Sequence, residues 1–256
     1  MKDFFAYFFG QGETEEFRIF TFAHLAPILV AAAAVYAIWH FREKIRTSRH
    51  ERTFAFVLAF AMIVSEMSYY WRMVGVPALE PTPTRDLPLS VCGWALILCS
   101  YMMVTRSQSL FDVAYFWLFS ASIFAVITPT TISFTGPTRF RYYQFWCVHT
   151  LGYIGIFYMM FVHKLRPTVR SIIRSASLLA VLAVIAAVAN ALIGEGANYL
   201  YMARPESAPS ILDILPPNYA LRVGIMVLAV AALFFLAYLP WLLIDLRKKR
   251  IAHPAE

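Results

Sequence analysis

Seven long apolar stretches run through the chain, and they constrain its fold more than any other feature. Each is close to the roughly 20 residues that cross a bilayer as an α-helix. The chain has 256 residues, of which 60% are hydrophobic and 14% are charged, whereas a soluble domain carries about 25% charged residues. The sequence therefore predicts an all-α fold, a polytopic membrane helix bundle with seven transmembrane helices in a single domain, residues 1–256. The predicted spans are Arg18–Phe41, Thr53–Val76, Asp86–Val104, Leu110–Ile127, Phe140–Val162, Ser171–Ile193 and Tyr219–Leu246.

Basic residues at the ends of these stretches predict the orientation of the bundle. Links that alternate along the chain, together with the C-terminal segment, hold 14 basic residues against five acidic ones, and the other side holds eight basic and ten acidic residues. Lysine and arginine gather on the cytoplasmic side of membrane proteins. We therefore expect the N-terminus outside and the C-terminus in the cytoplasm of a multi-pass protein of the cell membrane.

The basic residues that orient the spans also account for the net charge of +7, so we expect no nucleic-acid partner. The three cysteines, Cys92, Cys99 and Cys147, lie in apolar segments without the Cys or His spacing of a zinc site. We expect no metal and no cofactor.

Polar side chains inside the predicted spans concentrate in the outer half of the bundle, and the inner half is expected to be apolar packing. Ionisable groups in hydrocarbon normally face one another or a water-filled cavity, so their shared depth predicts one cavity open to the outer leaflet. In a helix that begins at Asp86, Cys92 lies about two turns inside, near the depth of His149. A thiol and an imidazole at one depth form a candidate nucleophile–base pair. The other polar residues of the outer half are His24, Glu66, Arg72 and Asn190.

Simpler interpretations remain open for several of these residues. A buried cysteine is often only a small apolar side chain, which is the interpretation we give to Cys99 and Cys147. His24, near the interface, is able to extend its ring toward water. Glu66 lies deeper and needs a partner or a proton; His24, His149 and Arg72 are the candidates.

Several short motifs resemble those of a bacterial membrane protein family. The segment 86–92, Asp-Leu-Pro-Leu-Ser-Val-Cys, resembles the LPLxxC motif of the YwaF-type integral membrane family. The segment 196–205 is similar to its GxNYxxLxxxP motif, and Ser210–Asp213 and Pro217–Tyr219 follow as in that family. His24 and the segment 145–149 fit its other polar positions.

The YwaF-type family is related to the phospholipid acyltransferase transmembrane protein 164. This resemblance implies a cysteine nucleophile at Cys92 and a histidine base at His149. The implied reaction is the transfer of an acyl chain to or from a glycerophospholipid through a thioester, with phospholipid and lysophospholipid as partners in the inner membrane of a bacterium. Glu66, Asn190 or His24 would orient the imidazole, and Arg72, Asn198 and Arg204 would bind the head group.

Two other functions remain open. Related membrane hydrolases have threonine in place of the nucleophile, so the same Cys–His pair is compatible with hydrolysis of a membrane lipid or ester. A transporter or receptor would use the outer cavity for a ligand without covalent chemistry, although the chain has no internal repeat of the kind found in many transporters.

Overall fold

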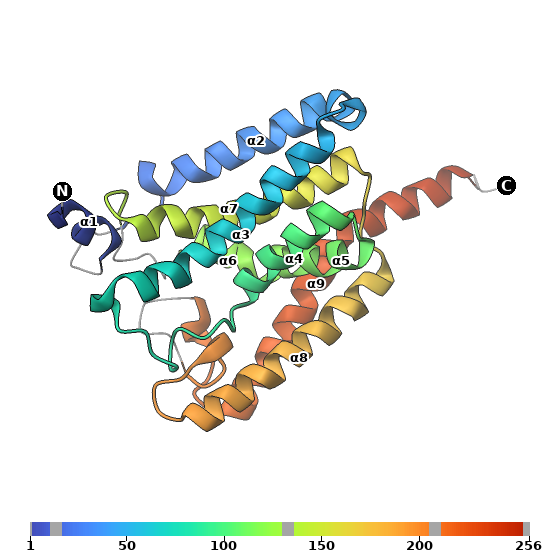
Figure 1. The fold of residues 1–256 in the computed structure, drawn as a ribbon. Helices are drawn as coiled ribbons and strands as arrows, with labels where there is room; N and C mark the ends of the chain where they lie inside the picture. The colour runs from blue at the N-terminus through green and yellow to red at the C-terminus, as the bar shows by residue number, and fades with distance from the viewer. Residues whose placement is uncertain (1, 11–16, 130–135, 205–210, 253–256) are drawn as a thin grey trace.

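The computed structural model describes residues 2–10, 17–129, 136–204 and 211–252, and within them the chain contains helices and no strand (Figure 1). Pro205 and Ser210, which belong to the motifs quoted above, lie outside these residues. The elements in order are α1 (Lys2–Phe9), α2 (Phe22–Thr47), α3 (Glu51–Gly75), η1 (Pro77–Leu79), α4 (Val91–Thr105), α5 (Gln108–Trp117), η2 (Leu118–Ser122), α6 (Ile123–Ile127), α7 (Phe140–Val162), α8 (Val169–Ile193), η3 (Tyr199–Tyr201), η4 (Ile211–Ile214) and α9 (Tyr219–Ala252).

Within the described residues, six helical segments are long and apolar enough to cross a membrane, with α5, η2 and α6 counted as one segment. The remaining apolar helix, α4, has only 15 residues, which give it a length of about 22 Å. The predicted third span was therefore wrong at its start. Residues 86–90 are not helical, and Ser90 caps a helix that begins at Val91. Pro88 accounts for this, because proline disfavours helical geometry in the residue before it and donates no backbone hydrogen bond.

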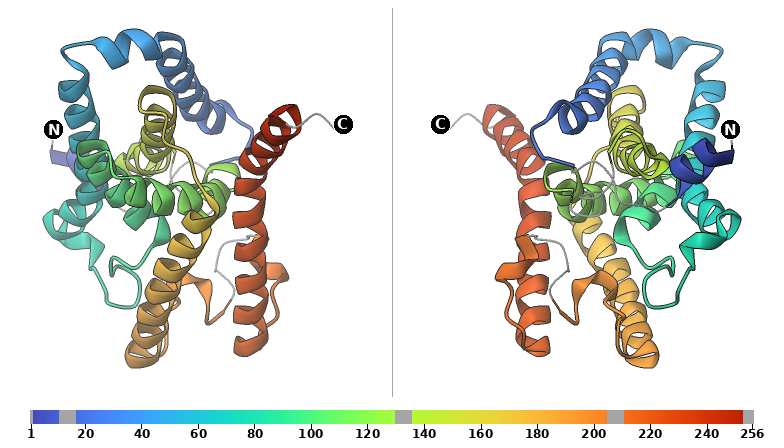
Figure 2. Two further views of the ribbon diagram at one scale, coloured as in Figure 1. Left: turned by 90° about the vertical axis from the view of Figure 1, so that its right-hand side faces the viewer. Right: turned by 90° about the vertical axis from the view of Figure 1, so that its left-hand side faces the viewer.

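The spans differ in how deeply they are buried in the bundle. In α7 and in the α5–α6 segment, 56% of the apolar window is buried, against 11% in α2, α8 and α9. The α7 helix packs against α2, α3 and α4, and Figure 2 shows it surrounded by other helices, with α8 and α9 to one side. The peripheral helices therefore present most of their apolar side chains to lipid.

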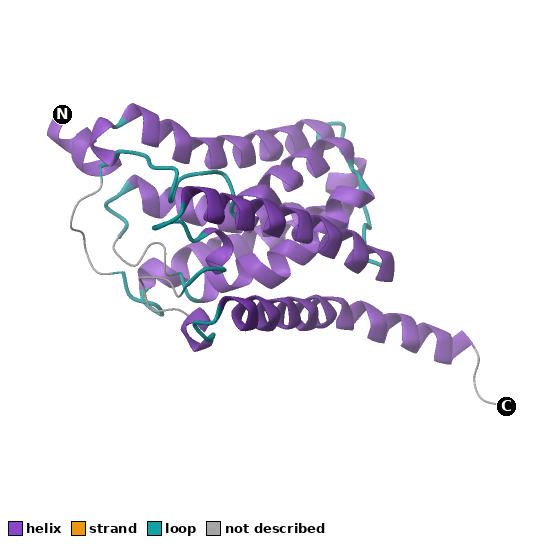
Figure 3. Cartoon of the chain, turned by 90° about the horizontal axis from the view of Figure 1, so that it is seen from below, coloured by secondary structure: helices purple, strands orange, loops and turns teal. Residues whose placement is uncertain are grey.

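The last helix is longer than a bilayer is thick. With 34 residues, α9 has a length of about 51 Å, while the hydrocarbon core measures about 30 Å. Its C-terminal part continues past the other helices (Figure 3). The basic run 247–250 lies in this extension, which is the position expected of residues that anchor a helix at the cytoplasmic surface.

Two clusters of charged side chains lie at the end of the bundle that carries the α2–α3 link, where we expected apolar packing. Glu51 accepts hydrogen bonds from Tyr158 at 2.7 Å and from His163 at 2.8 Å, and it also pairs with Arg106. Nearby, the buried Asp112 pairs with Arg174. The sequence analysis missed these clusters because their members are far apart in the chain and only helix packing brings them together.

The predicted orientation can be tested with reporter fusions. Fusions within the 163–174 link and at the C-terminus should report the cytoplasm, because the excess of basic residues lies there. A fusion within the 194–218 link should report the outer side. A cytoplasmic signal from that link would reverse the orientation and with it the assignment of the candidate site to the outer half.

Candidate functional site

The first turn of α4 carries the candidate nucleophile. Ser90 caps the helix by accepting a hydrogen bond from the Gly93 N–H at 3.1 Å, so that Cys92 is the second residue of the helix and partly buried. The buried Ser122 hydroxyl, in the π-helical turn η2, lies beside the Cys92 thiol, and within the described residues it makes no hydrogen bond.

Glu66 of α3 reaches the same turn of helix. Its carboxylate is buried and lies against the backbone of Gly93, where a Cβ atom would come within 2.3 Å of Oε1. Glycine at position 93 therefore permits this close approach. In the described part of the chain the Glu66 carboxylate makes no hydrogen bond and no ion pair. The expected pairing of Glu66 with His24, His149 or Arg72 is not present in the structure.

Arg141 is the positive charge that acts on Glu66, although the two groups are not in ion-pair contact. Its guanidinium lies 4.9 Å from the ring centroid of Tyr69 and donates a hydrogen bond to Gln144. The sequence analysis missed Arg141. The sequence did contain a signal for it, because Arg141 and His149 are eight residues apart, and this spacing places them on one face of α7.

His149 has one ring nitrogen fixed and one available. Its Nδ1 is 2.8 Å from the carbonyl oxygen of Phe145. Because a carbonyl only accepts, Nδ1 carries the proton of the neutral ring and Nε2 carries the lone pair. This is the arrangement that a general base requires. The orienting partner is the backbone of α7 itself, whereas we expected it to be Glu66, Asn190 or His24.

The register between α4 and α7 brings Cys92 and His149 to a similar depth. The Cys99 thiol donates to the Gly152 carbonyl at 3.8 Å, and both helices run in the same direction (Figure 1). Cys92 lies seven residues, about 10 Å, before Cys99, and the same rise along α7 leads from Gly152 back to Phe145. Helical side chains lean toward the N-terminus, so the His149 ring lies near Phe145. No hydrogen bond joins Cys92 and His149 in the structure, and their pairing stays a prediction.

Comparison with known proteins identifies the family. The sequence profile of the TMEM164 family matches residues 19–238. The chain belongs to the TMEM164 family. No curated protein and no solved structure matches it. The matched region runs from just before α2 into α9 and contains Cys92, His149 and every other candidate residue. Because the described residues include six helices able to span a membrane, this member of the TMEM164 family is a multi-pass membrane protein.

The other expected site residues of this TMEM164 family member bind backbone atoms in the structure. His24 is buried; its Nδ1 accepts from the Phe20 N–H at 3.0 Å and its Nε2 donates to Val126 O at 2.9 Å. It does not extend toward water, and it joins α2 to α6. Arg72 donates to Phe9 O and Gly10 O at 2.6 and 2.8 Å and so holds α1.

Asn190, Asn198 and Arg204 organise the link after α8. Asn190 exchanges two hydrogen bonds with the backbone of Tyr199, at 2.7 and 3.1 Å. Asn198 accepts from the N–H groups of Ala203 and Arg204, and the Arg204 side chain donates to Gly196 O at 2.7 Å. These contacts fold the 196–204 segment on itself.

Tyr199 connects this segment to the cysteine loop. Its hydroxyl donates to Pro83 O at 2.5 Å and accepts from the Leu87 N–H at 3.0 Å. The segments 86–92 and 196–204, far apart in the sequence, thus meet through one side chain, which positions the loop that leads into Cys92.

Cys99 and Cys147 differ in environment. Cys99 is fully buried in the core, as we expected for a packing residue, but Cys147 is exposed on the surface of the bundle. Within the described residues no group of three or more His, Cys, Asp or Glu side chains is arranged to bind a metal.

Asp86 holds the start of the cysteine loop and gives a pH-dependent prediction. Burial opposes its ionisation, yet hydrogen bonds from Arg85, the Thr82 N–H and Tyr69 hold the pKa of Asp86 below its ordinary value. A lowered pKa stabilises the fold above the unfolded value of about 3.9, and this contribution is lost as the pH falls through the folded value. Asp86→Asn should cost about 1 to 2 kcal/mol at neutral pH.

Thermal unfolding in detergent between pH 6 and pH 3 measures this effect. The difference between the wild-type protein and Asp86→Asn should shrink as the pH falls below about 4. A difference that stays constant over this range would show that ionised Asp86 does not stabilise the loop.

Proposed function

We propose that this protein is a membrane acyltransferase that moves a fatty acyl chain to or from a glycerophospholipid of the cell membrane through a thioester on Cys92. The observation that carries the proposal is the similar depth of the Cys92 thiol and the His149 ring, whose Nε2 is available as a base. Membership of the TMEM164 family supports a function in the membrane.

The reaction has two steps. His149 Nε2 takes the proton of the Cys92 thiol, and the sulfur attacks the ester carbonyl carbon of a donor phospholipid. The C–O bond breaks, the alkoxide of the lysophospholipid takes the proton from His149, and the acyl chain stays on sulfur. The hydroxyl of an acceptor lysophospholipid then attacks the thioester with His149 as base, and the thiol is restored.

The surrounding polar groups have distinct proposed roles. The Ser122 hydroxyl lies beside the thiol and makes no hydrogen bond to any described residue, which suits a donor to the sulfur or to the developing oxyanion. Arg141 makes a hydrogen bond to Gln144 through one nitrogen and is therefore our candidate for the lipid phosphate. Arg72 and Arg204 instead donate to backbone carbonyls.

Transfer between labelled lipids tests the proposal. The protein is reconstituted in vesicles that contain a phospholipid with a labelled acyl chain and an unlabelled lysophospholipid. We expect labelled product on the acceptor and a label on Cys92 that hydroxylamine removes. If labelled free fatty acid is the only product, the protein is a hydrolase. If there is neither a labelled product nor a label on Cys92, both enzyme activities are excluded and a binding or transport function is favoured.

A further inference from the structure

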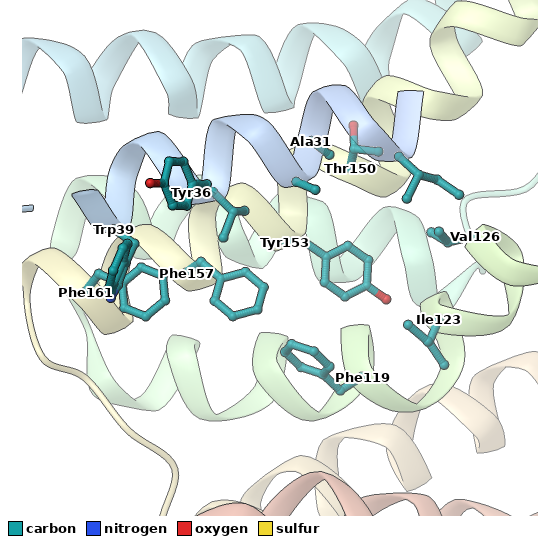
Figure 4. Close-up of a pocket in the computed structure, with 13 residues that line it drawn as sticks. Ala31, Tyr36, Trp39, Phe119, Ile123, Val126, Thr150, Tyr153, Phe157 and Phe161 are labelled. Atoms are coloured by element: carbon teal, nitrogen blue, oxygen red, sulfur yellow. The ribbon is translucent and has the colours of Figure 1, made fainter. Parts of the chain in front are cut away.

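A long apolar cavity lies on the far side of the wall that borders the candidate site. It has a volume of about 530 Å³ and is lined by residues of α2, α7 and the η2–α6 segment (Figure 4). Tyr36 and Trp39 on its rim are exposed, and α2 is a peripheral membrane helix. The cavity is therefore a groove that opens from the protein toward the hydrocarbon of the bilayer.

The groove presents almost no free polar group. The hydroxyl groups of Thr150 and Tyr153 both bind backbone carbonyls, of Trp146 and Leu118, at 2.7 Å. The other residues along it are alanine, valine, isoleucine and phenylalanine, and the remaining polar atoms belong to Tyr36 and Trp39 on the exposed rim. A ligand in this groove must therefore be hydrocarbon along its whole length.

The dimensions of the groove fit one chain of one leaflet. Along α2 it extends from Ile28 to Trp39, which is a length of about 16 Å. One leaflet contributes about 15 Å to the hydrocarbon core.

The wall between the groove and the candidate site is one layer of side chains. Ser122 lies beside Cys92, and the next residue, Ile123, lines the groove. His149 belongs to the candidate site, and the next residue, Thr150, lines the groove. Tyr153 lines the groove, and its hydroxyl is within electrostatic reach of the Cys92 thiol. The end with Ile123 and Thr150 is therefore the end next to the thiol, and Trp39 and Phe161 form the distant end (Figure 4).

We propose that this groove binds the fatty acyl chain of a membrane lipid, with its carboxyl end toward Cys92 and its methyl end between Trp39 and Phe161. This inference rests on the proposed function for the direction of the chain, but the binding of a chain does not require turnover. The space arises from Ala31 and Ala32, whose small side chains stand opposite the aromatic residues of α7.

The experiment measures binding without chemistry. Cys92→Ala protein is reconstituted in phosphatidylcholine vesicles that contain a phospholipid with a photoreactive diazirine near the methyl end of one acyl chain. After irradiation, mass spectrometry maps the label. We expect labelling of Phe161 and Trp39 to fall at least fivefold when Ala32→Phe fills the groove. Ala33→Phe is the matched control, because Ala33 is exposed in the same alanine run and does not line the groove.

A second variant excludes loss of fold as the cause. Phe157→Ala removes a ring from the opposite wall, so the Ala32→Phe/Phe157→Ala protein should recover the labelling. Equal labelling of Phe161 in Ala32→Phe and Ala33→Phe, or labelling confined to lipid-facing residues such as Val30, would overturn the proposal.

The two proposals fail separately. Groove labelling in a protein whose wild-type form transfers no acyl chain would retain the groove and remove the proposed function. Acyl transfer without groove labelling would retain the proposed function and remove the groove as the binding site of the acyl chain. If both hold, Ala32→Phe in the wild-type background should lower the rate with a 16-carbon donor about tenfold relative to an 8-carbon donor.

Discussion

Replacing Cys92 with alanine should reduce acyl transfer by at least about a thousandfold, because the covalent step has no other nucleophile. Cys92→Ser should be nearly as inactive, since a hydroxyl loses its proton far less readily than a thiol. His149→Gln should lower the rate of transfer by about a hundredfold or more, because glutamine cannot accept the proton. Transfer in reconstituted vesicles, measured as the rate of acyl appearance on the acceptor, checks all three variants.

Cys147→Ala is the matched control for this series. Cys147 is exposed on the surface of the bundle, so its loss should leave the rate of transfer within about twofold of the wild type. If Cys147→Ala were inactive and Cys92→Ala active, Cys147 and not Cys92 would be the nucleophile.

Glu51→Ala should destabilise the protein by about 3 kcal/mol, since removing one partner leaves the other charges of a buried cluster uncompensated. Glu51 is 8% exposed and bonds with residues of α4–α5, α7 and the turn after α7: Arg106, Tyr158 and His163. The Arg106 side chain is 44% exposed, so it regains water when Glu51 is lost, and the expected cost is at the lower end of the range for buried pairs. The midpoint of thermal unfolding in detergent measures the change.

Glu43→Ala is the control for Glu51→Ala. Glu43 also pairs with an arginine, Arg46, at 2.6 Å, but its side chain is 67% exposed. Such a pair contributes about 0 to 1 kcal/mol, so the unfolding midpoint should barely change. Equal effects of the two substitutions would show that the Glu51 cluster does not stabilise the end of the bundle that carries the α2–α3 link.

The sequence by itself determined the membrane class, the number of apolar helices and most of their positions. Hydrocarbon excludes water, so a spanning chain must satisfy its backbone hydrogen bonds within helices, and hydropathy then gives the spans directly. The predicted fifth span, Phe140–Val162, coincides with α7. The start of α4 was missed, although Pro88 and the capping Ser90 gave a local signal for it.

The partners of the polar side chains were decided by the tertiary structure. His24, Arg72, Asn190 and Asn198 have the depth and chemistry of site residues, but each bonds to backbone atoms that neighbouring elements bring close. Sequence gives the depth of a residue along its helix, whereas rotation and register between helices decide which groups meet. The Cys99–Gly152 contact, which sets Cys92 level with the His149 ring, and the groove opposite Ala31 and Ala32 arise only when α2, α4 and α7 pack together.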